Sequence, residues 1–293
     1  MTAIRKTGKI NDDTILIDAN MMGVPSILCI YLIEAGKSCL IDAGTHIEAR
    51  KTLKHLKELN KFPPDMIIAT HSHWDHVQAI PFLCQRAKKE GKEIEILASA
   101  AAIPNLRDQS YNDIFEAGPF NNIEEEITPL KEGDIVDLDG ITLKIFEAHG
   151  HMDDEIAILD EKNNNLFVGD VLGMKVADKV FVPPFMPPKW DKKAYLNSID
   201  KFKKIEYETL CLDHFGYYYG NDAKSLLDES LANTDQYWGD FEENVEHIED
   251  IPYLIENVLK KRVPESILEQ YPERLVQAVV YWLSLGFKIY KGL

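Results

Sequence analysis

The sequence is short of basic residues, of cysteines and of long apolar runs. Lys and Arg number 32 against 49 Asp and Glu, so the 293-residue chain carries a formal net charge of −17. A surface this acidic repels phosphate groups, which makes a nucleic acid or an anionic membrane surface a poor partner. We therefore expect neither of these partners and favour a small-molecule substrate.

Only four cysteines are present, at Cys29, Cys39, Cys84 and Cys211, and each lies within an apolar run. No pair has the two-residue spacing of a zinc knuckle or a redox motif. This pattern favours reduced thiols that are buried and act as small apolar side chains.

No apolar run approaches the roughly 20 residues that a membrane-spanning helix requires. The polar start at residues 1–8 also lacks the apolar stretch of a secretory signal. We therefore expect a cytoplasmic protein with no membrane partner. Hydrophobic residues still make up 45% of the chain, which is enough for a substantial core.

Short strand-like runs alternate with helical segments over the first three quarters of the chain. We expect strands near 15–17, 27–33, 39–44, 66–70, 94–98, 134–137, 141–148, 155–159, 166–170 and 209–212, and helices at 47–60, 76–90 and 192–204. Asp139-Gly140 predicts a hairpin turn, and 104–129 predicts irregular structure. Strands with interleaved helices in both halves indicate an α/β protein with two sheets flanked by helices.

Residues 221–293 change to helical spacing, in three segments at 223–238, 245–261 and 264–290. The last segment is strongly apolar and must pack on something. We divide the chain into a catalytic domain at 1–220 and a helical C-terminal extension at 221–293. The extension either covers the catalytic domain or forms a subunit contact, so a homodimer through these helices is one expectation.

The segment Thr70 to His76, with the sequence T-H-S-H-W-D-H, carries the strongest functional signal. Because alternate residues at a strand end point to the same side, His71 and His73 can hold one metal ion together. Asp75 and His76 follow where the chain turns into a helix, so they can reach a second ion. Imidazole nitrogen and carboxylate oxygen suit Zn²⁺, and also Fe or Mn.

Further candidate ligands follow the ends of later predicted strands: His149, His151, Asp170 and His214. A single histidine is more often structural than a ligand. Several of them at the ends of neighbouring strands can converge on one rim of a sheet, and this set therefore supports the metal site.

These motifs resemble those of the metallo-β-lactamase superfamily. The segment 70–76 matches its T-H-x-H-x-D-H motif, Leu40-Ile-Asp-Ala-Gly its earlier strand and turn, and Phe167-Val-Gly-Asp its Gly-Asp strand end. The resemblance covers about residues 13–216. It implies an αββα four-layer sandwich with metals between the ends of two sheets, here followed by the C-terminal helical extension.

The resemblance also implies two divalent metal ions, with Zn²⁺ favoured. Their ligands would be His71, His73 and His151 for the first ion, Asp75, His76 and His214 for the second, and Asp170 as a bridge between both. A bridging water or hydroxide would attack the substrate, and Asp75 could also act as a catalytic residue that steers its proton. Asp42 would either orient a ligand histidine or stabilise its own turn.

The chain departs from the family pattern at several positions. His149-Gly150-His151 replaces the usual Pro-Gly-His. The spacing favours His151 as the ligand and leaves His149 either to support a ligand or with a structural role. Residues 153–155, Asp-Asp-Glu, replace small residues and are expected to be solvated, with amide capping or binding of a cationic group as alternatives. The helix after His76 lacks the frequent His-x-Gly-Gly start, which weakens an assignment to the hydroxyacylglutathione hydrolases.

The activity that follows is dinuclear metal-dependent hydrolysis of a thioester, a lactone or a related ester. The apolar loop at 181–190 could wall a pocket for an acyl chain and the aromatics at 215–219 could rim it, or both could pack on the helical extension. The alternatives are a phosphodiesterase or nuclease, which the charge disfavours, a diiron redox or oxygen-sensing protein, and a binding protein with a relic site. The similar flavodiiron branch usually has Glu at the position of His73, so this residue favours hydrolysis.

Overall fold

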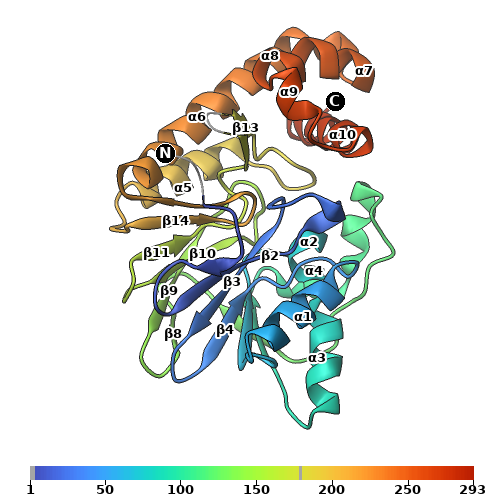
Figure 1. The fold of residues 1–293 in the computed structure, drawn as a ribbon. Helices are drawn as coiled ribbons and strands as arrows, with labels where there is room; N and C mark the ends of the chain where they lie inside the picture. The colour runs from blue at the N-terminus through green and yellow to red at the C-terminus, as the bar shows by residue number, and fades with distance from the viewer. Residues whose placement is uncertain (1–3, 178–179) are drawn as a thin grey trace.

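The computed structural model describes residues 4–177 and 180–293. Two mixed β-sheets lie face to face, and helices cover their outer faces (Figure 1). The α/β class and the four-layer αββα sandwich expected from the sequence are therefore confirmed. A further group of helices lies across one end of the sandwich.

The first sheet has seven strands in chain order: β1 Gly8–Lys9, β2 Thr14–Asp18, β3 Cys29–Glu34, β4 Ser38–Ile41, β5 Met66–Ala69, β6 Glu95–Ser99 and β7 Ile127–Leu130. Strands β1 to β4 pair antiparallel, and β4 to β7 pair parallel. Parallel neighbours need crossover connections, which are supplied here by helices α1 Ala49–Glu58 and α3 Ile80–Lys89.

The second sheet has six strands in the order β15-β14-β11-β10-β9-β8. Their bounds are β8 Ile135–Asp137, β9 Thr142–Glu147, β10 Ile156–Asp160, β11 Asn165–Phe167, β14 Thr209–Leu212 and β15 Gly216–Tyr219. The predicted turn at Asp139-Gly140 joins β8 to β9, and both of its residues have positive φ. Helix α5 Lys192–Phe202 precedes β14, which pairs parallel with β11.

Alternate side chains of the facing strands form the core between the two sheets. Tyr31 on β3 and Phe167 on β11 meet there, with ring centroids 5.1 Å apart. All four cysteines are buried and free, as expected. Burial raises the pKa of each thiol, for Cys84 to about 12, so these residues act as apolar side chains.

Two predicted elements differ in the structure. The helix expected at 76–90 is split into α2 Trp74–Val77 and α3, because the His76 carbonyl accepts from the amides of Ala43 and Gly44. The stretch 104–129 is more regular than expected, with α4 Ile103–Arg107, a 3-10 helix at Gln109–Phe115 and strand β7. Strand β7 contains Pro129 and forms the sheet edge, where a missing amide hydrogen is tolerated.

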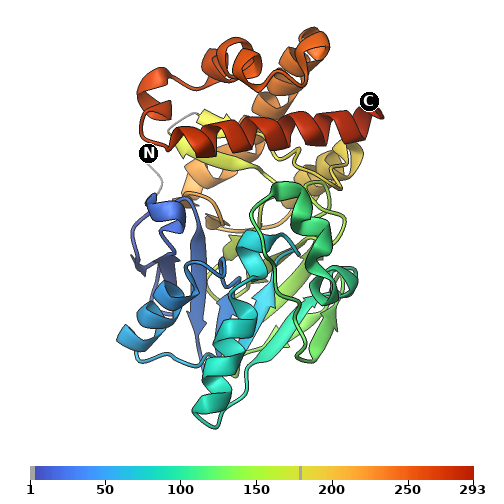
Figure 2. The ribbon, with the colours of Figure 1, turned by 90° about the vertical axis from the view of Figure 1, so that its right-hand side faces the viewer.

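The C-terminal helices begin with α6 Gly220–Glu243 and end with α10 Glu273–Lys291. Between them lie α7 Ile251–Leu254, a π turn at Ile255–Leu259, α8 Lys260–Arg262 and α9 Glu265–Leu268, where two unbroken segments were expected. Helix α10 runs across the end of the sandwich (Figure 2). No helix among the described residues is both long and apolar enough to cross a membrane.

A short hairpin lies between the sandwich and these helices, formed by β12 Met174–Ala177 and β13 Val180–Val182. Tyr271, between α9 and α10, donates its hydroxyl to the Val176 carbonyl at 3.1 Å. Gly286 of α10 packs directly on the chain after β13, because a Cβ there would lie 2.1 Å from the Phe185 carbonyl oxygen. The C-terminal helices thus contact the rest of the chain beside the strand ends that carry the predicted ligands.

Candidate metal centre

Three histidines meet where the two sheets open at their strand ends. His71 and His73 follow β5 directly, and His151 lies in the turn after β9. His71 Nε2 is 3.1 Å from His73 Nδ1, and His151 Nε2 is 2.8 Å from the same atom. Each residue presents one ring nitrogen, and these nitrogens lie within 4.8 Å of one another. The group could hold one metal ion.

A second group combines Asp75 and His76 of α2 with His214, which follows β14. Asp75 Oδ1 is 3.7 Å from His76 Nε2, and Asp75 Oδ2 is 3.6 Å from His214 Nε2. One carboxylate therefore faces two imidazoles from different sheets. This group could hold another ion.

Asp170, in the turn after β11, lies between the two groups. Its Oδ2 atom is 3.2 Å from His214 Nε2, 3.4 Å from His76 Nε2 and 3.7 Å from His151 Nε2. The structure thus brings together all seven residues predicted as ligands: His71, His73, Asp75, His76, His151, Asp170 and His214. His149 lies two residues before His151 and belongs to none of the groups found among the described residues.

The histidines are oriented by hydrogen bonds at the ring nitrogens that face away from the cluster. His151 Nδ1 donates to the Pro184 carbonyl at 2.8 Å, and His73 Nε2 donates to the Pro187 carbonyl at 3.1 Å. His214 Nδ1 donates to the Ile27 carbonyl. Each bond fixes the tautomer and leaves the opposite nitrogen with its lone pair directed at the cluster, which is the arrangement a metal ligand needs.

Asp42 orients two more rings. Its Oδ2 atom accepts from His76 Nδ1 at 2.8 Å and from the Thr70 hydroxyl at 2.7 Å. Because the Thr70 hydroxyl donates to Asp42, its oxygen can accept from His71 Nδ1, 3.0 Å away. Of the two roles predicted for Asp42, the structure therefore favours the orientation of ligand histidines.

Asp213 is a residue that the sequence did not single out as functional. Its carboxylate is fully buried, with Oδ2 3.6 Å from His76 Nδ1, on the side of the ring that Asp42 also faces. Burial, together with the nearby Asp42 carboxylate, raises the pKa of Asp213 well above its ordinary value. The only sequence signal was its position next to His214.

The chemistry of the cluster fits metal ions. His76 Nε2 and Asp170 Oδ1 are buried and find no hydrogen-bond partner among the described residues. Burial lowers the pKa of His71 and His73 well below the ordinary value, so both are neutral, the form that binds metals. Burial also lowers the pKa of His76, but the carboxylates of Asp170 and Asp75 raise it well above normal. The carboxylates thus favour a positive charge at this position.

The expectation that residues 153–155 are solvated is wrong for two of the three. Asp153 is exposed and pairs with Lys189 at 3.2 Å, but Asp154 and Glu155 are fully buried. Asp154 accepts hydrogen bonds from the hydroxyl of Ser72, inside the ligand motif, and from the Asn105 amide. The buried carboxylate of Asp154 therefore holds the loop of the Thr70 to His76 motif through Ser72. The acidic residues beside Asp154 in the sequence did not indicate that it is buried.

Glu155 accepts a hydrogen bond from the backbone amide of Asp170, at 2.6 Å. The contact requires Gly169, which has φ +56° and where a Cβ would lie 2.5 Å from Glu155 Oε1. The amide capping named as an alternative in the sequence analysis is thus the role that the structure supports. Glu155 thus positions the backbone of Asp170.

We expect Glu155→Ala to weaken metal binding by roughly 10- to 100-fold, as the loss of a group that orients a ligand commonly does. Glu155→Gln is the matched control, because its amide oxygen can still accept from the Asp170 amide. Titration of the metal-free variants with Zn²⁺ against a competing chelator measures both affinities. Equal weakening in the two variants would contradict this role of the amide contact.

The loop at 181–190 and the aromatics at 215–219 serve packing more than substrate contact. Phe185 packs on Trp238 and Phe241 of α6, with ring centroids 5.5 Å apart in each case. Phe215 faces Tyr271, and Tyr217 lies in the core between the sheets. The structure thus favours packing on the helical extension for Phe185 and Phe215, whereas Val182 of the same loop lines an apolar pocket. The backbone of the loop has a further role, because its carbonyls orient His73 and His151.

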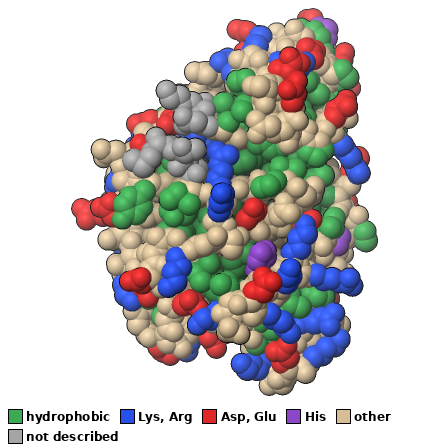
Figure 3. All heavy atoms as spheres, in the orientation of Figure 1, with side chains coloured by type: hydrophobic (Ala, Val, Ile, Leu, Met, Phe, Trp, Pro, Cys, Tyr) green, Lys and Arg blue, Asp and Glu red, His purple; other side chains and the backbone are tan. Residues whose placement is uncertain are grey.

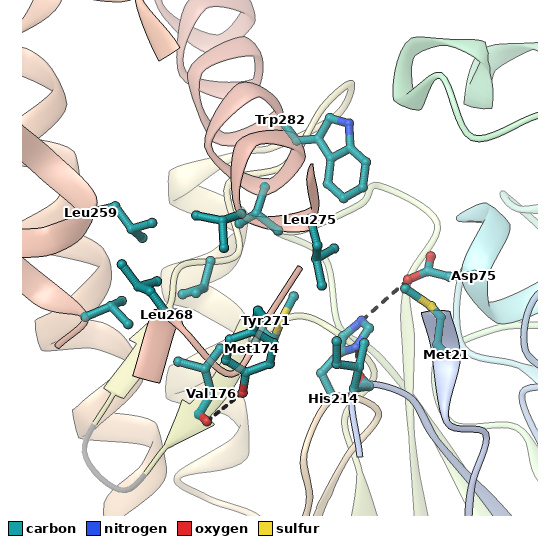
Figure 4. Close-up of a pocket in the computed structure, with 15 residues that line it drawn as sticks. Met21, Asp75, Met174, Val176, His214, Leu259, Leu268, Tyr271, Leu275 and Trp282 are labelled. Carbon is teal, nitrogen blue, oxygen red and sulfur yellow. Dashed lines mark hydrogen bonds and ion pairs between the residues drawn. The ribbon is translucent and has the colours of Figure 1, made fainter. Parts of the chain in front are cut away.

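An apolar pocket adjoins the second ligand group (Figure 4). Asp75 and His214 stand at one end, while Leu259 and Leu268 of the C-terminal helices stand at the other. The expected apolar wall therefore exists, but it is supplied mainly by the C-terminal helices. Sequence reasoning missed it because these helices are remote from the ligand motifs along the chain.

Comparison with known proteins gives the class of protein that this fold and site define. A family model described as the metallo-beta-lactamase superfamily matches residues 23–214. The chain belongs to this superfamily. Its described His and Asp clusters include groups that could hold metal ions.

Individual relatives are distant. A hydroxyacylglutathione hydrolase of Hydrogenovibrio crunogenus is 26% identical over 148 residues, which are 50% of this chain and 44% of that protein. The chain thus matches less than half the length of this curated relative. A protein of Methanocaldococcus jannaschii named probable metallo-hydrolase is 30% identical over 149 residues, 48% of this chain and 66% of that one.

Among solved structures, a metallo-beta-lactamase family protein of Thermus thermophilus is similar over nearly the whole chain. The match has a TM-score of 0.59 and 19% sequence identity, and it covers 97% of this chain and 95% of the other. At this identity the likeness concerns the fold alone.

Proposed function

We propose that the chain is a dinuclear hydrolase of thioesters, lactones or related esters. The observation that carries the proposal is the position of Asp170, with one carboxylate oxygen within 3.7 Å of imidazoles from both ligand groups. When bound, two divalent ions lower the pKa of a water molecule and polarise a carbonyl oxygen. Zn²⁺ is our first choice because five imidazoles and two carboxylates suit it, with Fe or Mn as alternatives.

The chain's own residues then have separate tasks. Asp75 borders both the second ligand group and the apolar pocket, so its carboxylate can accept the proton of the attacking water. The carbonyls of Pro184 and Pro187 hold His151 and His73 in their ligand orientation. The apolar pocket keeps bulk water away from the substrate beside Asp75, which strengthens the electrostatic interactions there.

A phosphodiesterase or nuclease activity is less favoured. Many of the Lys and Arg side chains on the face in Figure 3 gather at its lower right. Within α1, Lys54 pairs with Glu58 at 3.6 Å and Lys57 with Glu90 at 2.7 Å. The described residues that line the apolar pocket include no Lys or Arg that could bind a phosphate group.

Metal removal and an assay panel test the proposal. We expect the purified protein, never exposed to chelator, to contain about two zinc ions per chain, and chelation to lower its melting temperature. With the ligand at a hundred times its Kd, binding stabilises a fold by about 2.7 kcal/mol per site, so the shift amounts to several degrees and Zn²⁺ should reverse it. Thioesters, lactones and phosphodiesters are then compared with the loaded protein.

Each alternative has its own signature in these experiments. Two irons per chain with a visible absorption band would replace the hydrolase by a redox or oxygen-sensing protein. Turnover of phosphodiesters alone would favour the nuclease branch. Metal-loaded protein with no turnover of any of the three substrate classes would refute the proposed function.

A further inference from the structure

The apolar pocket is enclosed by two parts of the chain that are far apart in sequence. Met174, Val176 and Val182 of the hairpin β12–β13 form one side. The C-terminal helices close it with Leu259, Val263, Leu268, Leu275, Val276 and Val279. Its volume is about 70 Å³. Figure 4 shows these side chains pointing toward one another, with Asp75 and His214 at the end that meets the ligand cluster.

The pocket offers no partner for a charge at the end remote from the ligand cluster. Asp75 and His214 are at the cluster. The remaining polar groups among the described lining residues are the indole N–H of Trp282 and the hydroxyl of Tyr271, which already donates to the Val176 carbonyl at 3.1 Å, and neither carries a charge. The described lining residues include no Lys or Arg. A carboxylate, phosphate or ammonium group placed in this pocket would lose its hydration without compensation.

From these observations we infer that the pocket holds an unsubstituted aliphatic acyl chain of the substrate, with the carbonyl at the Asp75 end. The inference rests on the proposed function, since the reacting carbonyl must lie at the ligand cluster. The enclosed volume limits the length of the aliphatic chain, so we expect an optimum chain length rather than an unlimited gain with each added methylene.

The polar part of the substrate has a separate place. A wider hollow of about 490 Å³ lies on the other side of Leu275 and Trp282, and both residues line both spaces. It carries Glu48, Glu116 and Arg274, of which Glu116 and Arg274 are solvent-exposed. A polar leaving group can lie there in contact with water, so it need not enter the apolar pocket.

A chain-length series tests the inference. Acyl thioesters of N-acetylcysteamine, from acetyl to dodecanoyl, are compared with the zinc-loaded protein. Burial of each methylene favours binding by about fourfold, so kcat/KM should rise on the order of a hundredfold from acetyl to hexanoyl and fall again for dodecanoyl. A series in which kcat/KM is flat or falls from acetyl onward would overturn the inference while leaving the proposed function intact.

A matched pair of variants tests where the acyl chain of the substrate binds. Val276→Trp introduces an indole at a partly buried position that lines the pocket, whereas Val245→Trp makes the same change at an exposed position outside it. We expect the optimum to shift to shorter acyl chains in Val276→Trp and to stay unchanged in Val245→Trp. The contrary result is the same dependence of kcat/KM on acyl-chain length in both variants, with melting temperatures that show both to be folded. That result would mean that the acyl chain binds elsewhere.

A binding measurement separates the inference from the chemistry. Octanoate, the carboxylate of an eight-carbon chain, should bind to the zinc-loaded wild type with its carboxylate at the cluster, at least tenfold more tightly than acetate in isothermal titration calorimetry. The preference should disappear in Val276→Trp. If octanoate binds in this way but no ester is turned over, the pocket assignment stands and the proposed function fails. Equal affinities for acetate and octanoate would overturn the pocket assignment.

Discussion

Asp170→Ala is expected to empty or loosen both metal positions and to lower kcat/KM by about a thousandfold or more. The carboxylate approaches imidazoles of both ligand groups, so its removal would take one ligand from each ion. Asp75 would then be the remaining carboxylate between His76 and His214. Metal ions contribute several kcal/mol of transition-state stabilisation, and about 4 kcal/mol corresponds to a thousandfold in rate. Elemental analysis and steady-state kinetics of the purified variant measure the two effects.

His149→Ala is the control for this experiment. His149 has the same residue type as the ligands and lies two positions from His151, but it belongs to none of the metal groups found among the described residues. Its metal content should stay close to that of the wild type. Equal metal loss in His149→Ala and Asp170→Ala would mean that the wrong histidine of the pair was assigned.

Asp75→Asn is expected to have the second largest effect, with kcat lowered about 10²- to 10⁴-fold. The amide keeps the size of the side chain and one oxygen for a metal, but it cannot accept the proton of an attacking water. Metal content should therefore fall less than in Asp170→Ala. The comparison of kcat with metal content in the same preparations separates the proton-transfer role from the ligand role.

Asp153→Asn supplies the matched control, because Asp153 is an exposed carboxylate close in sequence to His151 and pairs only with Lys189 among the described residues. It should retain wild-type kcat. If Asp75→Asn lost activity only in proportion to its lost metal, Asp75 would be a ligand and not a proton acceptor.

The grouping of the candidate ligands could be predicted from the sequence because much of it is encoded locally. His71, His73, Asp75 and His76 lie within six residues, directly after a buried strand whose end fixes where they point. The others also follow strand ends, and strands of two facing sheets that open on the same side bring such positions together. The same regularity of strands made the four-layer sandwich predictable.

The supporting residues could not be predicted, because their environment depends on contacts between distant segments. Glu155 belongs to an acidic run that is typical of a solvated turn, yet it is buried against the Asp170 amide where Gly169 leaves room. Asp213 is buried against a ring that comes from the other sheet. For such residues the hydrophilic sequence predicts solvent exposure. Only the tertiary structure shows that they are buried.

The lining of the apolar pocket could not be predicted for a related reason. Its wall includes residues of the segment 255–282, where the chain breaks into short helices that periodicity merged into two long ones. The side that each residue presents depends on where those breaks fall. If the π turn at Ile255–Leu259 and the break at 269–272 are left out, the predicted helices present their apolar faces in directions that differ from those in the structure.

Helix α10 approaches the chain after β13 closely where Gly286 packs on the backbone at Phe185. That backbone continues to Pro187, whose carbonyl orients His73. The helix that closes the acyl pocket thus touches the main chain two residues before a group that aims a ligand. A bulky side chain at position 286 would accordingly have two effects. It would weaken binding of the hydrocarbon tail, and it would change the orientation of the His73 imidazole.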